Sequence, residues 1–321
     1  MNNLRDERRR DVQQAREILA NFHADVQVSN RSIPAEEAAR LRSLGYVAGS
    51  GVPNKVYTTA DDPKNLVDVD RKLHDIIDAY ERHQLDRAIA IGRELVAAQP
   101  KMAAGRELLA FVLQQREQIS DAIANLREAV RLGGETQSAR VQLALLLTES
   151  GKSNEAVKIL APMAQSNDPD VLNAYGIALA DQGDVDRAAQ QFQRVLQADP
   201  NNAPALQNLG IVALRRDDVR SAQEYLSRAL ALNPRLPLAL NAMGVVYARD
   251  NDDAHAIASW RQAVAIDPHQ YDALLNIGRL EGHLGHSAEA RQALTQFVNS
   301  APKEKYGADI AAARQALTAL P

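Results

Sequence analysis

The side chains that could carry out chemistry are few and scattered in this sequence of 321 residues. It contains no cysteine, which excludes disulfides, zinc–thiolate sites and thiol nucleophiles. Of its seven histidines, only His283 and His286 have a spacing typical of metal ligands; a zinc site would need one or two further ligands converging there, and none is evident from the sequence. The acidic runs at 217–218 and 250–253 lack the alternating pattern and closing glutamate of a calcium loop, so we interpret them as helix N-caps.

Motifs of catalysis and of phosphate binding are also missing from the sequence. Neither of the common glycine-rich phosphate loops occurs, and the run GSG at 49–51 lies in a loop-like stretch. Spacing alone defines no catalytic triad or pair of carboxylates. We therefore predict no catalytic residue, no cofactor and no metal ion.

Charge and hydropathy exclude two kinds of partner. The formal net charge is −4, whereas duplex-binding proteins normally carry a basic surface that neutralises phosphates. The apolar run VQLALLL at 141–147 is among the longest in the chain and is far shorter than a membrane-spanning helix. The first twenty residues lack the apolar core of a signal peptide. We expect neither a nucleic-acid partner nor insertion into a membrane.

A proline recurs every 34 residues, at Pro200, Pro234, Pro268 and Pro302. Each follows an apolar-rich segment and predicts the end of a helix, because proline has no N–H and disfavours helix in the residue before it. Placing these prolines at position 32 of a repeat aligns small residues at positions 8 and 20 and bulky residues at position 24. The three columns are Gly176, Gly210, Gly244 and Gly278; Ala188, Ala222, Ala256 and Ala290; and Phe192, Leu226, Trp260 and Leu294.

The columns predict pairs of packed helices. Small residues allow two helices to cross closely, and bulky residues fill the space around the crossing. Polar turn residues at 182–184, 216–218, 250–252 and 284–286 separate the two helices of each pair. This pattern resembles the tetratricopeptide repeat, a helix–turn–helix unit of 34 residues.

The resemblance implies an all-α fold: a right-handed tetratricopeptide-repeat solenoid of about seven helix–turn–helix repeats with a C-terminal capping helix. Two repeats are irregular, since 137–168 is two residues shorter and 69–102 has Ile76 and Gly92 where the pattern has a small and a bulky residue. We predict a capping helix at 305–321. The repeats are predicted at 69–102, 103–136, 137–168, 169–202, 203–236, 237–270 and 271–304.

The front of the chain differs from the repeats. Residues 1–46 are predicted to form a helical tail segment, and residues 47–68, rich in Gly, Pro, Thr and Asp, a linker. The phrase LRSLGYV at 41–47, then Asp62-Pro63-Lys64 and helical repeats, resembles the C-terminal tail of bacterial sulfatases of the alkaline-phosphatase superfamily. The resemblance covers about residues 1–66.

The catalytic domain of that family is not in this sequence. Sulfatases use a Cys or Ser in a C/S-x-P-x-R phrase, together with Asp, Asn and His ligands for calcium. The nearest phrase here runs from Ser32 to Glu36 and has glutamate in place of the arginine, so we interpret Ser32 as a helix cap. The resemblance therefore implies a hydrolase region that is not itself an enzyme. It also implies a periplasmic or exported protein; otherwise we expect a cytoplasmic one.

Stacked repeats of this kind curve so that their first helices line a concave groove. Amide side chains there offer a donor and an acceptor to a peptide main chain, and arginine suits a carboxylate. We predict a non-catalytic scaffold that binds an extended protein or peptide segment in this groove. The candidate residues are Asn173, Gln207, Asn208, Asn241, Asn276, Arg215, Arg249 and Arg279.

Two alternatives remain open. In the first alternative, the partner is the protein's own catalytic domain or a second copy of the chain. The region would then have a regulatory, targeting or oligomerisation role in a sulfatase-like hydrolase. Separately, the repeats at 69–168 are expected to present a more apolar concave surface, which residues 47–66 of the same chain could cover. That surface consists of Leu73, Ile77, Tyr80, Phe111, Val141 and Leu145.

Overall fold

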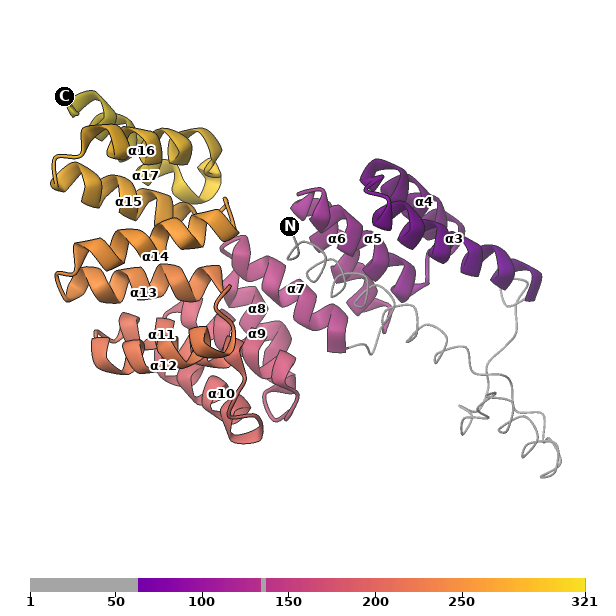
Figure 1. Cartoon of the computed structure of the whole chain (residues 1–321). Helices are drawn as coiled ribbons and strands as arrows, with labels where there is room; N and C mark the ends of the chain where they lie inside the picture. The colour runs from indigo at the N-terminus through magenta and orange to yellow at the C-terminus, as the bar shows by residue number, and fades with distance from the viewer. Residues whose placement is uncertain (1–62, 134–136, 321) are drawn as a thin grey trace. The chain divides into compact units, whose positions relative to one another are not determined.

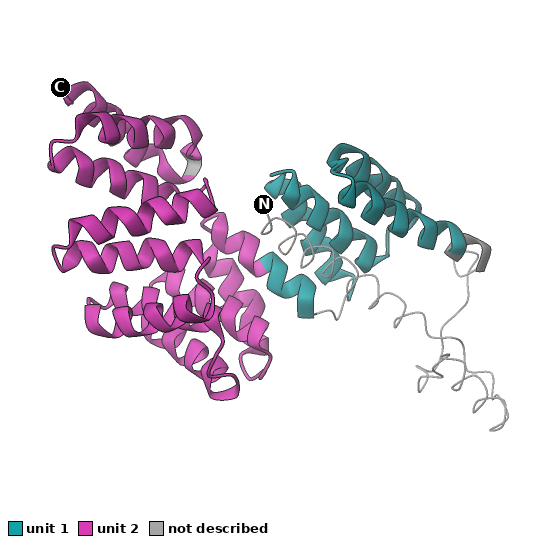
Figure 2. Cartoon of the chain, in the orientation of Figure 1, with its two compact units in different colours: residues 1–143 teal, residues 144–321 magenta. Residues whose placement is uncertain are grey.

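The computed structural model describes residues 63–133 and 137–320. All regular structure in these ranges is helical, which confirms the predicted all-α fold (Figure 1). The chain divides into two compact units, residues 1–143 and 144–321, and each is described by itself (Figure 2). The predicted tail segment and the first part of the predicted linker lie outside the described residues.

The described part of the first unit consists of two helix pairs and the first half of α7. Helix α3 begins at Pro63, so the end of the predicted linker is helical instead. A proline is well suited to a first helical turn, because the N–H that it lacks would have no intrahelical partner there. The helices are α3 (Pro63–Glu81), α4 (Leu85–Ala98), α5 (Ala103–Gln115), α6 (Ile119–Arg131) and α7 (Gln137–Glu149).

The second unit continues the same arrangement from the second half of α7. Helix α8 (Ser153–Leu160) is short and passes into the 3₁₀ turn η2 (Ala161–Met163), since Pro162 cannot continue the α-helical hydrogen bonding. Four regular pairs and a final helix follow. They are α9 (Pro169–Gln182), α10 (Val185–Ala198), α11 (Ala203–Arg215), α12 (Val219–Leu232), α13 (Pro237–Arg249), α14 (Asp253–Ile266), α15 (Tyr271–His283), α16 (Ser287–Ser300) and α17 (Lys303–Ala319).

The turn between the helices of each pair has one residue with a positive φ. It occupies position 15 of every repeat, as glycine in three repeats and as another residue in four. These residues are His83, Glu117, Gly151, Gly183, Asp217, Asn251 and Gly285, with φ between 60° and 96°. The recurrence shows that the seven helix pairs share one backbone turn, including the two irregular ones.

The core of each regular pair depends on a glycine on the first helix facing a bulky side chain on the second. A Cβ added to Gly176 would lie 2.5 Å from a ring carbon of Phe192, and one added to Gly244 would lie 2.4 Å from Nε1 of Trp260. Gly210 and Gly278 face leucines in the same way. The glycines at position 8 are therefore required chiefly by the side chain at position 24.

The first repeat reverses this size pattern. Ile76 replaces the small residue and is fully buried, while Gly92 replaces the bulky one. A Cβ on Gly92 would approach Leu109 of the next repeat to 2.9 Å, so the position has no room for a larger side chain. Leu109 of the next repeat therefore occupies the space beside position 24 in this repeat.

Helix α17 covers the end of the array, as predicted for a capping helix. Its buried residues Tyr306, Ile310 and Ala313 pack with Leu294 and Phe297 of α16. The rings of Tyr306 and Phe297 pack edge to face, with their centroids 5.7 Å apart. Burial raises the pKa of Tyr306, and the charge of Asp272 adds to the increase.

Within the described ranges, no helix has both the length and the apolar character needed to cross a bilayer.

Candidate functional site

Three successive first helices, α9, α11 and α13, present the same sequence of side-chain types. Each has an amide residue, then a β-branched apolar residue four positions later, then a charged residue after four more. Residues four apart lie on one face of a helix, so the three types form parallel rows across the helices. The amide row is Asn173, Gln207 and Asn241, together with Asn208, which follows Gln207 in the sequence; the apolar row is Ile177, Ile211 and Val245; the charged row is Asp181, Arg215 and Arg249.

Helix α11 contacts both α9 and α13, so the rows are continuous from one helix to the next. The three residues of the apolar row are half-buried, and Ile211 and Val245 pack partly against the core beneath them. This face therefore remains accessible at its centre while its side chains are held in place by packing.

Two acceptors of the amide row have no hydrogen-bond partner. The Oδ1 atoms of Asn173 and Asn241 are buried, and neither accepts a hydrogen bond from any described residue. A buried acceptor without a partner costs about 1–3 kcal/mol. Between them, Gln207 and Asn208 are buried, and Gln207 Nε2 donates to Asn208 Oδ1 at 3.5 Å, a long hydrogen bond. The amide row thus holds two acceptors without a described partner, and both lie below the accessible surface of these helices.

The arginines of the charged row are engaged within the chain. Arg215 donates to the backbone carbonyl of Ala180 in the preceding repeat. Arg249 forms an ion pair with Asp217, with Nη1 2.6 Å from Oδ1. Each side chain thus ties one repeat to the one before it, so neither is available as the isolated cation that a carboxylate clamp requires.

The last repeat does not continue the rows. Leu275 stands where the amide row would continue, and Arg279 stands in the apolar position. Arg279 Nη2 donates to Asp309 of α17 at 2.8 Å. Asn276, half-buried, occupies the position that corresponds to Asn208. The structure therefore brings together four of the eight predicted residues in one row, and places Arg215 and Arg249 beside it.

Of the six residues of the predicted apolar surface, three are buried, and Tyr80, Val141 and Leu145 are half-buried. Leu73, Ile77 and Phe111 are buried, with exposed fractions of 1%, 6% and 3%. Tyr80 and Phe111 stack edge to face, with ring centroids 5.2 Å apart. The three buried residues belong to the core, whereas sequence periodicity placed them on a surface.

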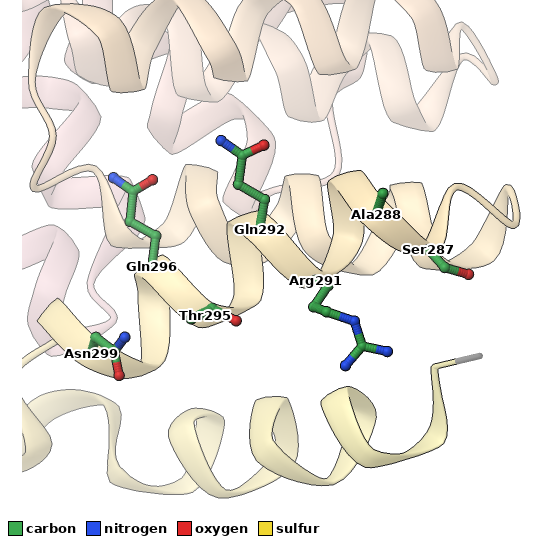
Figure 3. A pocket seen from close by; sticks show the side chains of 7 residues that line it. All are labelled: Ser287, Ala288, Arg291, Gln292, Thr295, Gln296 and Asn299. Atoms are coloured by element: carbon green, nitrogen blue, oxygen red, sulfur yellow. The ribbon is translucent and has the colours of Figure 1, made fainter.

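A shallow depression of about 800 Å³ lies along α16, lined by residues of that one helix (Figure 3). The lining side chains are mostly exposed, and Gln292 and Gln296 point away from Arg291 (Figure 3). Arg291 is directed toward α17, where it donates to the carbonyls of Leu317 and Leu320. The depression lacks the enclosing walls and convergent polar groups of a small-molecule site.

The histidine pair gives no metal site. His286 Nδ1 lies 2.7 Å from Oε2 of Glu281, a carboxylate that also accepts from Arg261. No group of three or more metal-ligating side chains occurs among the described residues. His286, at the start of α16, is therefore a hydrogen-bond partner of the buried Glu281 carboxylate.

The comparisons with known proteins agree with this architecture. Three family models, each described as a tetratricopeptide repeat, match residues 141–203, 179–246 and 272–304. A search of curated proteins found no match. None of these findings supports the sulfatase resemblance, whose residues 41–47 lie outside the described ranges.

Solved structures share the fold at low sequence identity. A tetratricopeptide repeat protein from Parabacteroides merdae has a TM-score of 0.63 at 14% identity, over 78% of this chain and 97% of its own. The Cut9–Hcn1 hetero-tetramer of the APC/C has a TM-score of 0.61 at 18% identity, over 80% of this chain and 50% of its own. A human IFIT1 dimer with PPP-AAAA has a TM-score of 0.61 at 15% identity, over 88% of this chain and 72% of its own.

The repeated helix pairs, their shared turn and the covering helix define an α-solenoid. More particularly, its fold is that of a tetratricopeptide-repeat solenoid, and residues 141–246 and 272–304 match family models of that repeat.

Proposed function

We propose that the chain is a non-catalytic scaffold that binds an extended peptide segment of a partner protein along the amide row. The observation that carries the proposal is the pair of buried, unpartnered acceptors at Asn173 and Asn241. The N–H groups of a peptide main chain lie at regular intervals along an extended segment, and they would satisfy both oxygens once the two amide side chains rotate toward the groove.

The direction of the amides supports one continuous site. Asn173, Gln207 and Asn241 occupy the same position of three successive repeats, so their side chains leave equivalent helices at equivalent points. A bound main chain would form a hydrogen bond at each, and each is worth about 0.5–1.5 kcal/mol net. Filling a buried acceptor that is already desolvated adds to this gain.

The test is selection from a random peptide display library. The wild type is compared with a variant in which Asn173, Gln207, Asn208 and Asn241 are all alanine. The matched control replaces four exposed amides outside the row, Gln292, Gln296, Asn299 and Gln315, by alanine. We expect the wild type and the control to enrich the same peptides and the row variant to enrich none of them. Equal enrichment by the row variant, with an unchanged melting curve, would refute the proposal.

The role as a regulatory or targeting region of a sulfatase-like hydrolase remains a prediction. It depends on the phrases LRSLGYV and Asp62-Pro63-Lys64 ahead of the repeats. The native reading frame upstream of Asn2 tests it, because several hundred further codons with a C/S-x-P-x-R phrase would support it. We expect this chain alone not to turn over an aryl sulfate.

A further inference from the structure

The spacing of the three rows restricts the conformation of a ligand. Helices α9, α11 and α13 contact one another in turn, and packed helices have axes about 8–10 Å apart, so we expect their equivalent side chains to recur at about that interval. An extended chain advances about 3.1–3.4 Å per residue, which gives about three ligand residues for each repeat.

A ligand with three residues per repeat can direct an equivalent side chain to the apolar row at every repeat in only one regular conformation. In a β-strand, successive side chains alternate between faces, so residues i and i+3 point in opposite directions. In polyproline II, three residues complete a turn of about 9.3 Å, so residues i, i+3 and i+6 share one face. That conformation also has no internal hydrogen bonds, which leaves its N–H groups free for the amide row.

The rows also specify the side chains of the ligand. The apolar row offers Ile177, Ile211 and Val245 as three half-buried contacts, one for each repeat. The two unpartnered acceptors, on α9 and α13, are two repeats apart and require N–H groups about six residues apart. Proline has no N–H, so it fits the ligand only at other positions.

The charged row supplies no site for an acidic group. Arg215 bonds the Ala180 carbonyl and Arg249 is paired with Asp217. An acidic ligand would have to displace these contacts, and the gain from an exposed ion pair is small.

We propose that the rows of α9, α11 and α13 bind an uncharged peptide in the polyproline II conformation, with apolar side chains at i, i+3 and i+6. This inference rests on the proposed function and adds the conformation and the sequence class of the ligand.

The experiment measures fluorescence anisotropy with labelled, acetylated and amidated nonapeptides. The first probe is three copies of Val-Ala-Pro, which places valine at every third residue. The second is a permutation of the same composition with valine at the first, third and fifth residues. A third is the first probe with a free terminal carboxylate. The proteins are the wild type, the amide-row variant and the control with replaced exposed amides.

We expect the first probe to bind the wild type and the control at least about tenfold more tightly than the permuted probe, because only its valines meet the apolar row together. The free carboxylate should change affinity by less than about twofold. Binding should be lost in the amide-row variant. A further variant, Ile177→Ser, Ile211→Ser and Val245→Ser, should abolish the difference between the two probes.

The outcomes separate this inference from the proposed function. Equal affinity for both valine spacings, combined with loss in the amide-row variant, would overturn the inference and leave the proposed function standing. A large gain from the free carboxylate would also overturn it. Binding that does not change in the amide-row variant would overturn both. If the serine variant melts early, the comparison of probes on the wild type still decides the matter.

Discussion

At the scale of single residues, the close approach of Gly244 to Trp260 is the tightest of the glycine contacts at position 8. A Cβ there would lie 2.4 Å from Nε1 of the indole, which donates to the Asn241 carbonyl at 3.0 Å. The hydrogen bond joins the ring to the same helix that carries Gly244, so moving the ring away from an added Cβ would stretch it.

Gly244→Ala should therefore destabilise the protein by about 1–3 kcal/mol, because overpacking outweighs the gain in helix propensity. The matched control is Gly282→Ala on the neighbouring first helix, where the added Cβ would meet nothing closer than 3.8 Å. Chemical denaturation of both variants measures the difference. A loss of stability in the control that equals the loss at Gly244 would contradict the packing argument.

The turn at position 15 is the second residue-scale feature with a measurable cost. Gly183 has φ of 96°, and nothing lies within 4 Å of the place where a Cβ would stand. Gly183→Ala should cost about 1 kcal/mol through backbone strain alone. Gly183→Asn should cost less, since asparagine tolerates this conformation and Asn251 adopts it in a later repeat. Equal losses for both variants, read from thermal melts, would show that φ is not the cause.

At the scale of helices, Glu281 joins α14, α15 and the start of α16. Its side chain is 3% exposed and accepts from Arg261 at 2.6 Å and from His286 at 2.7 Å. Both partners are more than half exposed. The same position holds leucine in three earlier repeats, as Leu113, Leu147 and Leu179, so an apolar side chain fits there.

Arg261→Ala should therefore cost more than Glu281→Leu. The first change leaves a buried carboxylate with one partner, at a cost of about 1–3 kcal/mol. The second removes the buried charge and returns the arginine to water. Urea denaturation measures the free energy of unfolding of both variants. A larger loss for Glu281→Leu than for Arg261→Ala would mean that the carboxylate makes a net contribution to stability.

The helix pairs were predictable from the sequence because their determinants are local and repeated. Proline ends, glycines at position 8 and polar turns recur in register, and each acts within its own repeat. The partners of Arg249 and Arg279 were not predictable in this way. Asp217 and Asp309 lie 32 and 30 residues away, and only the stacking of neighbouring repeats brings them within reach. The amide row was found by its spacing, whereas the unpartnered state of Asn173 and Asn241 required coordinates.

At the scale of the whole molecule, stability should be distributed unevenly along the chain. Within each unit, a repeat packs mainly against its sequence neighbours, so parts of the array can unfold separately. Trp260 is the single tryptophan and reports on the later repeats alone, whereas far-ultraviolet circular dichroism reports on every helix.

We expect the urea midpoints from these two probes to differ, because such an array departs from two-state unfolding. A destabilising change in the first unit, such as Ile76→Ala, should move the circular dichroism curve and leave the tryptophan curve in place. Coincident curves for the wild type, with both probes shifted equally in Ile76→Ala, would show a single cooperative unit.

The matching of position 8 with position 24 has a consequence for how such a gene can recombine. Where a glycine faces Phe192, Leu226, Trp260 or Leu294, a crossover in the turn between the helices joins compatible halves. The first repeat, with Ile76 and Gly92, cannot exchange halves in this way. One product would set isoleucine against a bulky side chain, and the other would set glycine against glycine and leave a cavity. Viable crossovers that involve this repeat should therefore fall between repeats.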